Sequence, residues 1–469
     1  MKVGTKLILI FVISGIVITF LLSWIIEFYK YQNRLVLIDD VAKAFEDVNS
    51  LVRKVYPRTD REALAENTKK LFESSLSKMP KKCLPIDAFK YVQPVLSTLN
   101  DQNLRMYPPV EPVYSVLPFS VVVIDGRVIV SSSAVESVKA GDEIVEINSK
   151  SVDKLISELI VFTSGEDYLV KEQQLTSLFQ LVPELLDKKK DVVGIFYKQK
   201  EYNVKLRSEN GENEVSVKTL TAFSYPRESA QYPALPSRVP FEFTRKGDVG
   251  ILKLGTFQLS GTMFNKYREF LNNTFIQNRD LKLLLLDLRG VSSRDFTIFK
   301  ELYEHFLSKQ VSIKRYISVI NTAYNMDLLE KYGYEFTQTT GELIRLEFEH
   351  TFIPRDPFVN ADVWILFDRY TSNAALDFIY TFKKLRKSRT IGEPTLMKIN
   401  HTTELNFRYD DNLMTTFSFP TAIFSEDYGE SGLMPDFTID MDTEKRIQYI
   451  KGEGDYMLSE ALKIINNEN

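Results

Sequence analysis

The stretch ADVWILFDRYTSNAALDFIYTFKKLRKSRTIGEPTLMK, residues 361–398, decides the fold. It begins with a short apolar run, Val363 to Phe367, that has the composition of a strand buried on both faces. A turn follows, and from Ala374 to Lys384 the pattern favours a helix. A second short strand then leads into a Gly-Glu-Pro-Thr loop. The stretch therefore predicts a strand-turn-helix-strand unit of a layered α/β protein.

The preceding hundred or so residues repeat this alternation. A strand is expected at Val249–Leu254, and the continuous apolar run Lys282–Arg289 predicts a second strand covered on both faces. Helices are expected near 262–275 and 296–308, with another strand near 312–320. Strands that alternate with helices indicate one α/β core.

The first half of the chain has a different pattern. Residues 36–102 carry apolar side chains at helical spacing and predict an N-terminal helical segment. Residues 114–207 predict a small β-rich unit, since two β-branched runs, 121–124 and 127–130, flank an Asp-Gly turn. The polar, Pro-rich stretch 208–240 is typical of a linker or a surface excursion.

Taken in order, these segments resemble the tail-specific (C-terminal processing) serine peptidases, which have a crotonase-like core and an inserted PDZ-like domain. The stretches that carry the resemblance are AGDEIVEIN, VGILKLGTF, LLLLDLRG, TSNAAL, GEPT and SGLMPD. The resemblance implies a helical segment at 35–108, a PDZ-like domain at 109–208, a linker at 209–240, an α/β peptidase core at 241–446 and a C-terminal helix at 447–469.

The same resemblance implies where the catalytic groups should lie. The family motif T-x-Ser-Ala-Ala-Glu corresponds to residues 371–376, so Asn373 occupies the position of the nucleophilic serine and Leu376 that of the glutamate. An amide is not a usable nucleophile, but asparagine is a good helix N-cap, and capping is the preferred interpretation of Asn373. Asp377 lies one step further along the helix and is expected to face elsewhere.

Other parts of the catalytic machinery are also altered. The oxyanion region includes Gly290, Ser292 and Ser293, and the family's glycine pair falls at Ser292 and Ser293 or at Ser293 and Arg294. Lys398 remains where one branch of the family keeps its general base. The two histidines of another branch are replaced by Tyr56 and Asn103.

The PDZ-like segment implies a site for peptides or unfolded protein segments, bound by strand addition. Gly141 lies in the matching AGDEIVEIN stretch, and Leu117 and Phe119 flank the nearest candidate for a carboxylate-binding loop. A PDZ-shaped spacer without a ligand is the alternative.

The N-terminus predicts a signal anchor within residues 1–34. Leu7 to Ile26 form an uncharged apolar run of about 20 residues, which as a helix would span roughly 30 Å. Lys2 and Lys6 precede it, and no small-x-small cleavage site follows. The expected protein is single-pass, in the inner membrane, with its bulk periplasmic or extracellular.

Composition limits the remaining classes. The formal net charge is −4, with 59 basic and 63 acidic residues, so nucleic acid is not an expected partner. One cysteine, Cys83, and three histidines without ligand spacing argue against a metal site, and no cofactor is expected.

Two functional hypotheses follow, and the first is preferred. In the first, the protein is a pseudo-peptidase that binds peptide or protein segments without cleaving them. In the second, it is an active serine endopeptidase that uses Ser372 with Lys398. An unrelated chemistry in a crotonase-like cleft is the third possibility, because a fold alone does not determine a function.

Overall fold

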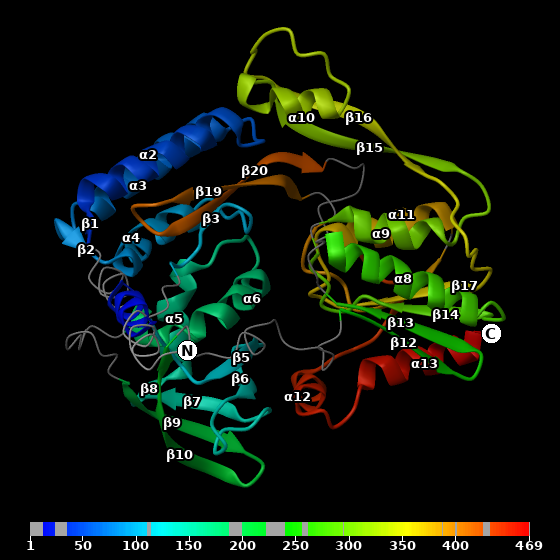
Figure 1. Ribbon diagram of the computed structural model, residues 1–469, viewed down its shortest axis with the longest axis horizontal. Helices are drawn as coiled ribbons and strands as arrows, with labels where there is room; N and C mark the ends of the chain where they lie inside the picture. The colour runs from blue at the N-terminus through cyan, green and yellow to red at the C-terminus, as the bar shows by residue number, and fades with distance from the viewer. Residues whose placement is uncertain are drawn as a thin grey trace, which may run out of the picture.

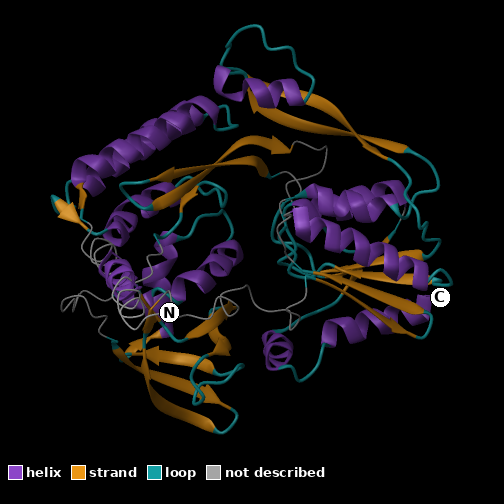
Figure 2. Cartoon of the chain, in the orientation of Figure 1, coloured by secondary structure: helices purple, strands orange, loops and turns teal. Residues whose placement is uncertain are grey.

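The computed structural model describes residues 13–23, 35–109, 114–186, 199–221, 240–255, 261–293, 295–386, 388–398, 401–424 and 432–468. These residues form two lobes (Figure 1). The N-terminal helices and a small β sheet make one lobe, and a sheet with helices on both faces makes the other. A long antiparallel sheet runs across the top of this view and joins the two lobes (Figure 2).

The α/β lobe is built on a six-stranded sheet, parallel except for its first edge pair. Its strands, in spatial order, are β12 (Phe241–Lys246), β13 (Val249–Leu254), β14 (Leu283–Asp287), β17 (Asp362–Phe367), β18 (Arg389–Gly392) and β21 (Phe437–Thr438). Apolar side chains on one face pack against α8 (Gly261–Gln277), α9 (Phe296–Glu304) and α11 (Ala374–Arg386). The other face packs against α13 (Tyr456–Glu468). The continuous apolar runs of the sequence are explained by this double coverage.

The bridging sheet is antiparallel and contains five strands. Its order is β16 (Leu343–Phe352), β15 (Val311–Ile320), β20 (Thr415–Phe424) and β19 (Thr402–Asp410), with β3 (Arg105–Met106) also paired to β20. α10 (Met326–Lys331) contributes to the apolar cluster on one face of this sheet. The buried guanidinium of Arg315 on β15 bonds Asp377 on α11 at 3.1 Å, which ties the bridging sheet to the α/β lobe.

The helical segment comprises α2 (Ile38–Val55), α3 (Arg61–Leu76) and α4 (Pro85–Ser97). α2 presents a regular row of apolar side chains, which is the amphipathic pattern expected from the sequence. These side chains share one apolar cluster with Phe417 and Phe419 of β20. The helices therefore cover one end of the bridging sheet.

The small sheet has the strand order β10 (Gly211–Lys218), β9 (Glu201–Ser208), β7 (Glu143–Ile147), β6 (Arg127–Ser133) and β5 (Phe119–Ile124), with β8 (Lys150–Ser151) paired to β7. The predicted hairpin is present as β5 and β6, and its turn residues Asp125 and Gly126 both have positive φ. Two helices, α5 (Val152–Leu159) and α6 (Tyr168–Phe179), belong to the same unit. The remaining short elements are β1 (Val36–Leu37), β2 (Lys82–Cys83), β4 (Ser115–Val116), β11 (Leu220–Thr221), α7 (Val182–Leu185), α12 (Thr443–Lys451) and the 3-10 helices η1 (Ile160–Phe162) and η3 (Ala323–Asn325).

The predicted transmembrane helix is contradicted, and so is the inner-membrane location that depended on it. Within the described part of the chain, no helix is both long and apolar enough to cross a bilayer. Residues 13–23 are helical, and a helix of this length spans only about 16 Å. Residues 7–12 and 24–26 of the expected span lie outside the described residues.

Candidate active site at the Asn373 loop

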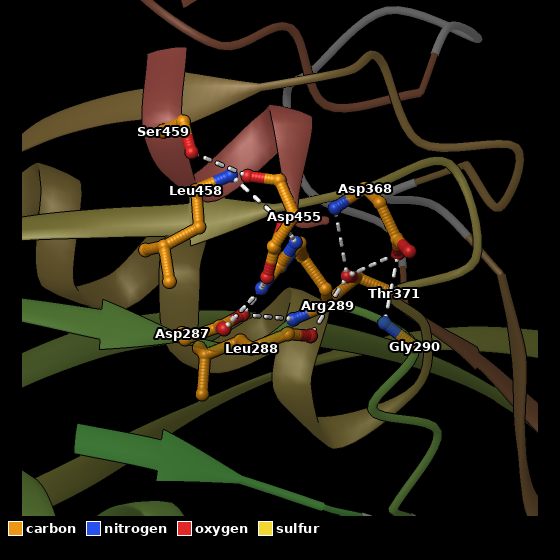
Figure 3. Close-up of polar contacts among 9 residues, drawn as sticks. All are labelled: Asp287, Leu288, Arg289, Gly290, Asp368, Thr371, Asp455, Leu458 and Ser459. Atoms are coloured by element: carbon orange, nitrogen blue, oxygen red, sulfur yellow. Dashed lines mark hydrogen bonds and ion pairs between the residues drawn. The ribbon is translucent and has the colours of Figure 1, made fainter. Parts of the chain in front are cut away.

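The loop between β17 and α11 is anchored to the loop after β14. Thr371 donates its hydroxyl to the carbonyl of Leu288 at 2.9 Å, and the amide of Gly290 donates to the Asp368 carboxylate at 2.8 Å (Figure 3). Both loops follow the carboxyl ends of adjacent parallel strands, where α/β proteins commonly build their sites. Burial raises the pKa of Asp368, and the Gly290 hydrogen bond opposes that rise.

A buried ion-pair network lies next to the contact between these two loops. Arg289 is bidentate to Asp287 at 2.6 and 2.8 Å and reaches Asp455, just before α13, at 2.6 and 2.7 Å (Figure 3). Burial disfavours the charge on Arg289, but the two carboxylates outweigh it and hold the pKa of Arg289 above its usual value. The arginine of the Asp-Leu-Arg-Gly motif therefore fastens the C-terminal helix to the sheet.

Asn373 stands at the helix start with a left-handed backbone, φ 56°. Asparagine tolerates this conformation better than most residues. Its carbonyl accepts the first bond of α11 from Asp377 at 3.2 Å, but its side-chain amide donates to the carbonyl of Ser292 at 3.3 Å. The side chain thus faces the oxyanion segment, and this contact differs from the expected capping of α11.

The backbone on either side of Asn373 is joined to the same segment. Ser372 donates its amide to the carbonyl of Val291, and Ala374 donates to that of Ser293, each at 2.9 Å. With Asn373, three consecutive residues donate to the three consecutive carbonyls of residues 291–293. Three hydrogen bonds therefore join the two loops at the position expected for the nucleophile.

This pairing affects the predicted oxyanion region. An oxyanion hole needs N–H groups that are free to meet a substrate oxygen. Here the Gly290 amide is bonded to Asp368, and the Val291 amide donates to Leu288 at 3.2 Å. Ser293 is buried, and its hydroxyl has no hydrogen-bond partner among the described residues. The segment thus presents carbonyl oxygens toward the Asn373 loop.

Lys398 bonds a partner in the PDZ-like unit. Its ammonium forms an ion pair with Glu166 at 2.8 Å, and both side chains are substantially exposed, at 42% and 64%. The hydroxyl of Ser372 accepts from the Asn373 side chain at 3.4 Å. The general base proposed for Ser372 therefore points across to the other lobe in this structure.

Tyr56 and Asn103, the residues expected at the positions of the family's two histidines, lie in one buried cluster. Tyr56 donates to the Asp101 carboxylate at 2.8 Å, as does the backbone amide of Asn103, also at 2.8 Å. The Asn103 side chain donates to the hydroxyl and carbonyl of Thr402, each at 2.9 Å, and Thr402 donates to Asp101 at 3.0 Å. Burial raises the pKa of Asp101 and, together with Asp101, that of the Tyr56 hydroxyl. Asp101 and Thr402 were not identified from the sequence, although Asp101 lies two residues before Asn103.

The predicted peptide-binding residues are not open to solvent. Leu117 and Phe119 are fully buried, and the Leu117 amide donates to the carbonyl of Gln180 at 3.0 Å. A side chain at Gly141 would collide with Lys451 of α12, since a Cβ there would lie 2.2 Å from that lysine's Cγ. A peptide would have to displace these contacts before it could reach the three positions.

Helix α6 lies along β5, the edge strand of the PDZ-like sheet. The amide of Val123 donates to the Thr176 hydroxyl at 3.3 Å, and Gln180 donates to the Ser120 hydroxyl at 2.7 Å. Beyond the strand, the Gly126 amide donates to the Glu172 carboxylate at 2.5 Å. α6 therefore covers the edge on which strand addition would occur.

No metal site was found in the described ranges, where no group of three or more His, Cys, Asp and Glu side chains is arranged to hold an ion.

Comparisons with known proteins agree with this architecture. Residues 113–227 match the family model described as PDZ domain. The chain is similar to mature CPAF complexed with lactacystin, with a TM-score of 0.61 at 13% identity, over 92% of this chain and 99% of that one. A CPAF mutant gives a TM-score of 0.66 at 12% identity, over 89% and 95% of the two chains. A photosystem II D1 C-terminal processing protease is more distant, with a TM-score of 0.44 at 14% identity, over 87% and 96%. No curated protein matches the chain.

These likenesses define the class of fold. The chain has the tail-specific peptidase fold with a PDZ domain, as its motifs predicted. At 12–13% identity, the likeness to the CPAF structures establishes the fold alone, because one fold can carry different chemistry.

Proposed function

We propose that this protein is a tail-specific peptidase homologue that binds peptide or unfolded protein segments and does not hydrolyse them. The observation that carries the proposal is the row of three hydrogen bonds that joins the Asn373 loop to residues 291–293. The nucleophile position holds an amide, and that amide donates to Ser292, in the segment that would have to offer N–H groups to a substrate.

A second argument concerns the base. Acyl transfer by serine needs a group that removes the hydroxyl proton. Asn103 replaces the histidine of one family branch and is engaged with Thr402, and Lys398, which the other branch would use, is paired with Glu166. An exposed, ion-paired lysine lacks the desolvation that makes buried lysines basic catalysts.

Retention of the scaffold supports binding as the remaining role. The PDZ match supports this role, because PDZ domains bind extended polypeptide ligands by strand addition. In this chain, the contacts between α6 and β5 must break before a peptide can add to β5 as a further strand.

One experiment separates binding from hydrolysis. The full chain is incubated with dye-labelled unstructured peptides, and anisotropy reports binding while mass spectrometry reports cleavage. A serine-reactive phosphonate probe is applied in parallel to the parent and to Ser372→Ala. We expect saturable binding, intact peptides and no labelling in either protein. Labelling or cleavage that disappears in Ser372→Ala would instead establish the Ser372–Lys398 endopeptidase.

A further inference from the structure

The outer strand of the bridging sheet, β16, is a long unpaired edge. All ten residues of β16 pair with β15 in one uninterrupted antiparallel register. Within the described part of the chain, no strand pairs with its other side. Strand edges of this kind are templates for pairing with another chain, and proteins usually shorten, kink or cover them.

Two other edges that the structure describes, those of β19 and β5, show such protection. β19, at the opposite side of the bridging sheet, contains Glu404 with φ 50°, and its pairing with β20 is interrupted at that residue. β5 of the PDZ-like sheet is covered by α6. The pairing of β16 with β15 is uninterrupted, and no described helix is seen to cover its free edge.

The two faces of β16 differ in character. Ile344, Leu346 and Phe348 belong to the apolar cluster under α10. Arg345, Glu347 and Glu349 alternate with them on the opposite, exposed face. The charges there are ordered along the strand, with one cation followed by two anions.

We propose that β16 pairs antiparallel with β16 of a second copy of this chain, so that the two bridging sheets become one continuous sheet across a two-fold axis. Leu346 lies on the axis, opposite Leu346 of the partner subunit. Arg345 is then opposite Glu347 of the partner subunit, and the symmetry repeats this ion pair on the other side of the axis.

The charges select this register over its neighbours. The register can change only in steps of two, because the charged residues have odd numbers and must stay opposite the partner's odd-numbered residues to remain on the same face of the sheet. A shift of two residues in one direction puts Arg345 opposite Arg345 of the partner subunit. A shift in the other direction puts Glu347 opposite Glu347 of the partner subunit. The proposed register contains two opposite-charge pairs on this face and no like-charge pair.

The opposite face is complementary as well. In the same register Ile344 is opposite Phe348 of the partner subunit, and the Leu346 side chains meet at the centre. Ile344 and Phe348 are half-buried in the single chain. Pairing would therefore extend the apolar cluster beneath α10 from one copy to the other.

Charge reversal tests the pairing. Arg345→Glu and Glu347→Arg each create like-charge contacts in a homodimer, and each is expected to weaken association by roughly tenfold or more. A mixture of the two single variants restores both ion pairs, as does the double variant within one chain. Sedimentation velocity over a concentration series measures the dissociation constants. A parent that stays monomeric, or single variants that associate as tightly as the parent, would overturn the proposal.

Cysteine cross-linking tests the register independently of affinity. Cys83 is the single native cysteine and is buried, so background coupling is low. Leu346→Cys places two thiols across the axis within disulfide reach and is expected to give a dimer band under mild oxidation. Ile344→Cys is the matched control, because its two copies are about 13 Å apart along the strand. Equal cross-linking of both variants, or of neither, would refute the register.

Discussion

The side-chain amide of Asn373 donates a hydrogen bond to the carbonyl oxygen of Ser292 at 3.3 Å. With the flanking amides of Ser372 and Ala374, it completes a row of three donors on three consecutive carbonyls. The position that the family resemblance assigns to the nucleophile therefore holds an asparagine whose hydrogen bonds fit its surroundings. An active serine enzyme would need the opposite polarity there, with N–H groups facing the substrate.

Restoring the serine alone should not restore catalysis. In Asn373→Ser the hydroxyl still lacks a base, since Lys398 is paired with Glu166 and Asn103 is bonded to Thr402. We expect peptide hydrolysis and phosphonate labelling to remain at background. The measurement is probe labelling followed by intact-mass analysis. Stoichiometric labelling of Asn373→Ser would show that a working base and oxyanion site persist.

The Arg289 network should be a major source of stability. Arg289→Ala leaves the fully buried Asp287 without its cation, and loss of one member of a buried pair typically costs about 3–5 kcal/mol. Arg245→Ala is the matched control, because its partner Asp280 is exposed and such pairs contribute about 0–1 kcal/mol. Urea unfolding curves give both values. Similar losses in the two variants would contradict the central role of the network.

Gly392 should not tolerate a side chain. A Cβ at this position would lie 1.8 Å from the carbonyl oxygen of Phe367 on the neighbouring strand, and φ is +134°. We expect Gly392→Ala to destabilise the fold by about 3 kcal/mol or more. Gly261→Ala, at the open start of α8, should change stability by less than about 1 kcal/mol. Thermal unfolding monitored by circular dichroism compares them, and a stable Gly392→Ala protein would be the contrary result.

His350 should make the fold sensitive to acid. Burial first, and then the Arg315 charge, lower the pKa of His350 from 6.5 to about 4. The folded chain thus resists a proton that the unfolded chain accepts, so stability is full above pH 6.5 and declines as the pH falls toward 4. We expect His350→Gln to remove about 1–2 kcal/mol of the difference in unfolding free energy between neutral and mildly acidic pH. Parallel pH profiles for parent and variant would contradict this assignment.

The α/β core could be predicted because its signals are local and redundant. The apolar runs at 282–289 and 363–367 have the composition that double coverage demands, and each is one strand of the central sheet. The glycines of the GEPT and SGLMPD motifs are also explained by packing. A Cβ at Gly392 or Gly432 would overlap a backbone carbonyl, so the packing of the fold itself requires glycine at both positions.

The site contacts could not be predicted, because they join distant segments. Thr402 and Asp101 are 301 residues apart, and no local pattern indicates that they share a hydrogen bond. The cover that α6 places on β5 is also invisible in the sequence, where residues 160–186 give no sign of which strand they contact. The anchor prediction relied on hydropathy, the flanking lysines and the lack of a cleavage site, whereas no helix in the described part of the chain is long and apolar enough to span a bilayer.

Helix α2 and strand β3, from the first quarter of the chain, both pack on β20 near residue 417, far along in the second half. The two lobes are therefore interleaved along the sequence and do not follow one another as separable modules. A protease that cut between residues 221 and 240 would leave two fragments that still hold each other through this shared layer. An excised C-terminal half would expose Phe417 and Phe419 to water, so the segment that looks like a complete peptidase core depends on the N-terminal helices for its own solubility.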